Sequence, residues 1–272
     1  MSADPLVAYA RSRDAGYPPS TQYADVILAC SQELREPLLA VYAVLHMADD
    51  IADDPAATPA ERRERFDGFL AAFRRVVVDG AAASSDPCEA AFERLARAHA
   101  RHAVASFAAY EPVFAALRAM IDWPPHPHFP DAFALAVYIR EKFSAIVEVF
   151  APFVLAAFAG HAYELLVDEF VHLMLAMHAV NMLMDLEEDA RAGQYWFPVP
   201  HCVASGAPTA AFARELIRDG HHHLACARHL RSAFVVGEPV AALFTGLAGI
   251  FEKLSVEVAA RLSLGPVTPV PG

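Results

Sequence analysis

The chain has 272 residues, of which 56% are hydrophobic, and its formal net charge at pH 7 is −12. This length suits one large domain or two small ones, with an ample core, and the acidic balance argues against nucleic acid as a main partner. Cys30, Cys88, Cys202 and Cys226 form no CxxC pair, so we interpret them as free thiols of a reducing compartment.

Helix-forming residues dominate the chain, and its 20 prolines cluster at a few places that indicate breaks between elements. No strand alternation, glycine-rich phosphate loop or repeat is found. The predicted fold class is therefore all-α, a single-domain helical bundle over residues 1–272. In chain order, the pattern predicts helices over residues 22–34, 36–54, 59–79, 86–107, 110–121, 130–158, 161–191, 208–234 and 238–263.

Two segments bear on location. The first residues, MSADPLVAYARSRDAGYPP, lack the basic region and apolar core of a signal peptide. The most apolar run, residues 149–160, contains Pro152 and is shorter than the roughly 20 residues needed to cross a bilayer. We expect a buried core helix there, and a cytoplasmic protein whose membrane association is at most peripheral.

Four aspartates close the helix predicted over residues 36–54, in the sequence MADDIADD. Residues four apart lie on one face of a helix, so Asp49 shares a face with Asp53, and Asp50 with Asp54. A solvated helix face would explain one isolated DxxxD. The body of this helix is almost wholly apolar, however, so most of its sides should be buried.

A second acidic motif closes the apolar sequence FVHLMLAMHAVNMLM. Asn181, Asp185 and Asp189 are spaced by four and should line one stripe of a helix, with Glu188 adjacent. Carboxylates on core helices need a counter-charge. Apart from Arg191, neither motif has an arginine or lysine at helical spacing. A divalent cation would supply the missing charge.

Aspartate oxygens without cysteine favour a hard cation, and Mg²⁺ fits best because it keeps waters and is often shared with a substrate phosphate. Two such clusters facing across a cavity would hold Mg²⁺ against a diphosphate, while apolar walls take a hydrocarbon tail. This arrangement suits ionisation of an allylic isoprenyl diphosphate. The non-enzymatic alternative is a helical interaction module whose acidic face binds a basic partner.

The sequences REPLLAVYAVLHMADDIADD and NMLMDLEEDARAGQYWFP resemble the two aspartate-rich motifs of the squalene/phytoene synthase family. The likeness covers roughly residues 20–200. It implies an all-α isoprenoid-synthase bundle with a central cavity, and Mg²⁺-dependent prenyl transfer from isoprenyl diphosphates. The resemblance also implies metal ligands at Asp49, Asp53, Asp185 and Asp189, with Asn181 matching the family asparagine.

The departures from the family pattern share a direction. The family's arginine before the first motif is His46 here, its glutamine before the asparagine is His178, and two arginines of the second motif are Met184 and Gln194. Binding two diphosphates needs several basic side chains besides metal. The loss of cations therefore favours transfer of one prenyl group to a neutral aromatic acceptor. Head-to-head squalene, dehydrosqualene or phytoene synthesis and terpene cyclisation are the alternatives.

Four further residues are candidates for binding the diphosphate or the second substrate. His46 lies on the face of the first motif and is expected to donate to the diphosphate, most strongly as an imidazolium. His178 lies on the face of the second motif, and Trp196 would stack on an acceptor. Glu148 sits in apolar sequence and, if buried, would accept a proton or orient an acceptor. The ordinary alternatives are core histidines, a helix-end cap and a solvent-facing carboxylate.

Overall fold

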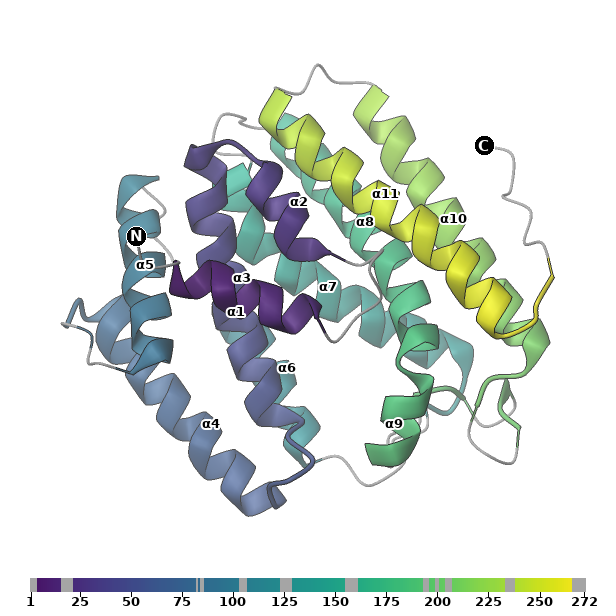
Figure 1. Cartoon of the computed structure of the whole chain (residues 1–272), viewed down its shortest axis with the longest axis horizontal. Coiled ribbons are helices and arrows are strands. Elements are labelled where there is room, and N and C mark those ends of the chain that lie inside the picture. Colours follow the sequence, from purple (N-terminus) through teal and green to yellow (C-terminus); the bar gives the residue numbers. More distant parts are fainter. Residues whose placement is uncertain are drawn as a thin grey trace. The chain divides into compact units, whose positions relative to one another are not determined.

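The computed structural model is predominantly helical, and no strand forms within the residues it describes (Figure 1). Cys202 and Pro208 make an isolated bridge. The predicted all-α fold class is confirmed. The described residues are 4–15, 22–81, 83, 86–102, 107–122, 129–154, 161–192, 196–198, 201–203, 207–232 and 238–265.

Most predicted helices are present with boundaries within a few residues of those expected. Two of them are divided, since residues 59–79 end in a π-helical turn and residues 161–191 are interrupted at Asp185. The elements are α1 (Pro5–Asp14), α2 (Tyr23–Ala29), α3 (Gln32–Ala52), α4 (Pro59–Phe73), η1 (Arg74–Val78), α5 (Pro87–Arg101), α6 (Tyr110–Ile121), α7 (Ala132–Val154), α8 (His161–Met184), α9 (Leu186–Ala192), α10 (Ala210–Ser232) and α11 (Glu238–Arg261).

Helix α1 is absent from the predicted elements, although its start carries a recognisable signal. Asp4 is the N-cap, and its carboxylate accepts the N–H of Leu6 at 3.0 Å, with Pro5 at the first helical position. The helix has no clear apolar stripe, and its buried residues are Leu6, Ala10 and Asp14. Because the other helices were predicted from the periodicity of their apolar residues, α1 could not be predicted in the same way.

The break between α2 and α3 falls at Cys30 and Ser31, five residues earlier than expected. Cys30 has an extended backbone with ψ of 161°, and the carbonyl of Ser31 accepts the N–H of Arg35 at 2.8 Å as α3 begins. Pro37 lies inside α3, where it removes one hydrogen bond of the ladder. The helix accommodates this proline and does not end there.

The chain divides into two compact units. Unit 1 contains Met1–Asp122 and Glu148–Phe158, and unit 2 contains Trp123–Val147 and Ala159–Gly272. Helix α7 contributes its first part to unit 2 and its last part to unit 1. The single domain over residues 1–272 stays a prediction.

Unit 1 is built around α3, which packs against α1, α4, α5 and α6. Every residue from Leu38 to Leu45 is buried, which confirms that the body of this helix lies in the core. Beside it, the ring of Phe73 meets the rings of Phe92 and Phe114 edge to face at 5.5 and 5.1 Å. The first acidic motif therefore extends from the end of a rigid core helix.

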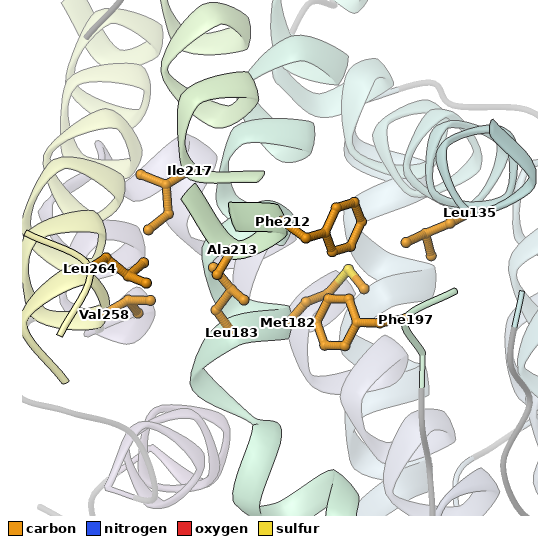
Figure 2. Close-up of a cluster of buried hydrophobic side chains, with 9 residues drawn as sticks. All are labelled: Leu135, Met182, Leu183, Phe197, Phe212, Ala213, Ile217, Val258 and Leu264. Atoms are coloured by element: carbon orange, nitrogen blue, oxygen red, sulfur yellow. The ribbon is translucent and has the colours of Figure 1, made fainter. Parts of the chain in front are cut away.

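In unit 2, helices α8, α10 and α11 run side by side (Figure 1). Met182 and Leu183 lie between the polar residues of the second motif and point into the hydrophobic core of this unit. The core thereby holds the backbone that presents the motif. Figure 2 shows the cluster, which consists of Leu135, Met182, Leu183, Phe197, Phe212, Ala213, Ile217, Val258 and Leu264.

Among the described residues, one segment, Leu166–Met184, is long and apolar enough to cross a membrane by length and composition. Within the fold, 67% of that window is buried, as in the core helix of a globular protein. This is weak support for a membrane span. The run expected from sequence, residues 149–160, is described only as far as Val154, at the end of α7.

Candidate functional site

The first motif lies at the end of α3, in unit 1. Asp49 is partly buried in the last turn, and Asp53 is an exposed residue that caps the helix. The N–H of Asp53 donates to the carbonyl of Asp49 at 3.1 Å, so the two aspartates are one helical turn apart. The predicted spacing of this pair is confirmed.

The other two aspartates of the motif pair with arginines from other helices. Asp50 accepts from the guanidinium of Arg13 in α1 and from the hydroxyl of Tyr9 at 2.8 Å. Asp54 accepts from Arg65 in α4 at 2.6 Å, and this guanidinium holds the pKa of Asp54 below its usual range. The expectation that these carboxylates lack a protein counter-charge is wrong, because the partners come from elements 37 and 11 residues away.

His46 lies on the partly buried side of α3, in contact with the same arginine. Nη2 of Arg13 lies 3.2 Å from Nδ1 of His46, and the ring of Tyr42 lies 4.2 Å from the imidazole. A guanidinium has only donors, so Nδ1 must accept and the proton of a neutral imidazole sits on Nε2. An imidazolium, the form expected to donate most strongly, does not fit this contact, since its Nδ1 would carry a proton facing a cation.

The second motif lies at the junction of α8 and α9, in unit 2. The N–H of Asp185 donates to the carbonyl of Asn181 at 3.0 Å, and the N–H of Asp189 donates to the carbonyl of Asp185 at 2.8 Å. The helical path thus continues through the interruption at Asp185, and all three side chains are partly buried. The predicted stripe is confirmed, and the ligand role of its members stays a prediction. The side chain of Glu188 lies outside the described residues.

Arg261 at the end of α11 reaches the last turn of α8. Its Nη2 donates to the carbonyl of Met184 at 2.9 Å and also to the carbonyl of Leu183. These carbonyls lie in the last turn of α8, where the helix dipole favours a positive charge. The arginine therefore stabilises the backbone that precedes Asp185. Sequence spacing gives no signal for this contact, because 77 residues separate Arg261 from Met184.

His178 lies partly buried on α8, with its ring 4.7 Å from the ring of Phe143. Burial and the nearby charge of Lys142 lower the pKa of His178 to about 3, so the imidazole is neutral. It can offer one N–H donor, but not a cation, to an anionic substrate. Its predicted binding role is therefore that of a neutral hydrogen-bonding group.

The structure also shows the side-chain environments of Trp196 and Glu148. Trp196 stacks on Tyr138, with ring centres 6.3 Å apart and planes tilted by 20°, and it packs against the core of unit 2. Glu148 is exposed, whereas its neighbours Val147 and Val149 are buried. The solvent-facing alternative therefore holds for Glu148, which occupies the outer face of α7, and the role of a buried carboxyl does not apply to it. Gln194 lies outside the described residues.

The aspartate pairs fit a hard cation in their chemistry. Each unit presents two carboxylates one turn apart, Asp49 with Asp53 and Asp185 with Asp189. No three histidine, cysteine, aspartate or glutamate side chains converge on a cation site among the described residues. Mg²⁺ commonly takes one or two carboxylates and completes its shell with water and substrate phosphates. Such a metal suits pairs of this kind.

Comparisons with known proteins decide the family. Residues 19–238 match the sequence model of the squalene/phytoene synthase family. The chain belongs to this family. Members are prenyltransferases that act on isoprenyl diphosphates and generally depend on a divalent metal.

A curated member of the family, the presqualene diphosphate synthase of Zymomonas mobilis subsp. mobilis, is 29% identical over 178 residues. The match covers 64% of this chain and 55% of that relative. The crystal structure of a dehydrosqualene synthase in complex with ligand superposes with a TM-score of 0.63 and 15% identity. It covers 96% of this chain and 99% of that one, which supports the same helical fold.

Proposed function

We propose that this chain is a Mg²⁺-dependent prenyltransferase that ionises an allylic isoprenyl diphosphate. The observation that supports this proposal is the pair of DxxxD motifs at the ends of apolar helices, in a member of this family. Bound Mg²⁺ would supply the positive charge that stabilises the departing diphosphate. Asp49, Asp53, Asp185 and Asp189 would hold the metal, and the apolar helices behind them would exclude water from the carbocation.

The second substrate is the finer part of the proposal. The missing arginines at positions 46 and 184 favoured one diphosphate and a neutral aromatic acceptor. In the fold, however, Arg13 contacts His46 and Arg261 contacts the carbonyl of Met184. Because Arg13 also pairs with Asp50, the first motif carries less uncompensated negative charge than its sequence alone indicates. This supports head-to-head coupling of two isoprenyl diphosphates as the first candidate.

The activity for which the curated relative is named, presqualene diphosphate synthesis, also favours this candidate. Transfer to an aromatic ring is the second candidate, since methionine and glutamine still replace arginine at positions 184 and 194. In both reactions, ionisation breaks the allylic C–O bond and releases inorganic diphosphate. The electron pair for the new bond comes from an alkene or from an aromatic ring, and the carbocation formed by this coupling then loses a proton.

Product analysis separates the candidates. The protein is incubated with Mg²⁺ and farnesyl or geranylgeranyl diphosphate alone, and then with a short allylic diphosphate and an electron-rich aromatic compound. A C30 or C40 product from one substrate supports head-to-head coupling, a prenylated ring supports aromatic transfer, and a cyclic terpene supports cyclisation. Titration calorimetry with a non-hydrolysable analogue counts the diphosphates bound.

A matched pair of variants tests the metal ligands. Asp49→Asn should abolish product formation, whereas Asp67→Asn should leave it intact. Asp67 is also a carboxylate of unit 1, but it pairs with Arg118 on the surface at 3.0 Å and lies outside both motifs. Turnover that survives both Asp49→Asn and excess chelator would contradict a metal-dependent mechanism.

A further inference from the structure

We propose that Arg13 is a positioning residue of the first acidic motif, which holds His46 as a neutral Nε2–H donor for the substrate diphosphate and neutralises Asp50. This inference rests on the proposed function. It assigns a role to helix α1, which carries neither aspartate motif. Figure 1 shows α1 lying across α3, the helix on which His46 and Asp50 stand.

The two ends of one guanidinium serve two partners. Nη1 of Arg13 donates to Oδ1 of Asp50, and Nη2 lies 3.2 Å from Nδ1 of His46. His46 and Asp50 are four residues apart on α3, so the arginine spans one helical turn of the motif face. The planar fork of arginine suits this double contact, whereas the point charge of a lysine would serve one partner well.

The contact with His46 has a chemical consequence. Because Arg13 cannot accept a hydrogen bond, Nδ1 of His46 is the acceptor and Nε2 carries the proton. The ring also packs on Tyr42 at 4.2 Å, which limits its rotation. The Nε2–H group is thereby fixed as a donor three residues before Asp49, at the motif that is expected to bind the metal and diphosphate.

The contact with Asp50 reduces the negative charge of the first acidic motif. Asp49, Asp50 and Asp53 fall within five residues of each other at the end of α3. An anionic substrate approaching this end would be repelled by an uncompensated third carboxylate. The Arg13 guanidinium cancels the charge of Asp50, so this third carboxylate adds less repulsion beside the DxxxD pair.

Helix α1 is held at both ends, so Arg13 is presented by a rigid element. The neighbouring Asp14 is fully buried; it accepts the N–H of Ala24 at 2.7 Å and the hydroxyl of Tyr42 at 3.3 Å. At the other end, Asp4 pairs with both terminal nitrogens of Arg94 in α5, at 2.5 and 2.9 Å. The pair at Asp4 offers a matched control, since it anchors α1 without contacting His46.

The first test reads the tautomer of His46 directly. The ¹⁵N chemical shifts of histidine-labelled protein are recorded, and the His46 signals are identified by their loss in His46→Gln. The wild type should show the Nε2–H tautomer, and Arg13→Gln should show a mixture of tautomers. If His46 of the wild type carries its proton on Nδ1, this result alone overturns the inference.

The second test measures affinity for a non-hydrolysable prenyl diphosphate analogue with Mg²⁺ by calorimetry. Arg13→Gln should weaken binding about ten- to a hundred-fold, the range for losing charge-assisted hydrogen bonds. Arg13→Lys should lose less than Arg13→Gln. Arg94→Gln should stay within about twofold of the wild type; an equal loss in this control would reduce Arg13 to an anchor of α1 and overturn the inference.

A third test moves the guanidinium from position 13 to position 46 and measures the same affinity. His46→Arg alone would set two guanidiniums against each other, so it should not improve binding. In the double variant Arg13→Gln with His46→Arg, the new guanidinium can reach Asp50, and much of the lost affinity should return. Absence of this rescue would overturn the role of Arg13. A wild type that binds no analogue would overturn the proposed function itself, which separates the two failures.

Discussion

Gly220 in α10 provides a sharp test of the packing in unit 2. A Cβ built on Gly220 would lie 2.8 Å from Cε2 and 3.1 Å from Cζ of Phe251 in α11, and 3.4 Å from the carbonyl oxygen of Ala176 in α8. The ring of Phe251 is fully buried and cannot move aside freely. Gly220→Ala therefore forces one methyl group into a filled space at the contact of three helices.

The magnitude follows from two opposing effects. Overpacking a filled core costs about 1–3 kcal/mol, while replacing glycine by alanine in a helix gains about 0.5–1 kcal/mol. Gly68 in α4 and Gly249 in α11 are matched controls, because an added Cβ there meets nothing within 4 Å. Both controls should be stabilised, whereas Gly220→Ala should fall about 1–3 kcal/mol below them in unfolding free energy.

The assay is denaturant unfolding of the three variants beside the wild type, followed by circular dichroism. Thermal melts give a second measurement, with a shift of about 2–4 °C for each kcal/mol in a chain of this size. If Gly220→Ala is stabilised as much as Gly68→Ala and Gly249→Ala, the close approach of α8, α10 and α11 at this point is refuted.

Three other predictions address the site and its surroundings. Asp49→Ala or Asp185→Ala should abolish product formation with an unchanged circular dichroism spectrum, since each removes one metal ligand; residual turnover would argue against that role. His46→Ala should weaken binding of a prenyl diphosphate analogue by about 1–3 kcal/mol, the range for a hydrogen bond to a charged group; equal calorimetric affinity would leave His46 a packing residue. Burial and the neighbouring His172 lower the pKa of His223 to about 4, so its stabilising effect is complete above pH 6.5 and is lost as pH falls toward 4. Urea unfolding should show that His223→Gln reduces the fall in unfolding free energy between pH 6.5 and pH 4 by up to about 3 kcal/mol. An unfolding free energy with the same pH dependence as the wild type would contradict the burial of this side chain.

The local sequence was sufficient for most of the helices and for the spacing within each motif, but not for α1 or for the break between α2 and α3. Helix α6 runs over Tyr110–Ile121 as predicted, because its apolar residues repeat with the period of a helix and Pro112 falls in its first turn. Asp49 with Asp53, and Asp185 with Asp189, lie one turn apart for the same reason. These features depend on residues three or four positions apart, which a single sequence displays directly.

The tertiary structure decided which charges are balanced. Arg13 reaches Asp50 and Arg261 reaches the carbonyl of Met184 from helices distant in the chain. Glu148 faces outward although its sequence neighbours are apolar, because helix orientation is set by packing. Helical periodicity reports which residues share a face, whereas the partner of a charged side chain depends on which helices the core brings together. For that physical reason the sequence alone indicated a deficit of cations that the folded chain partly fills.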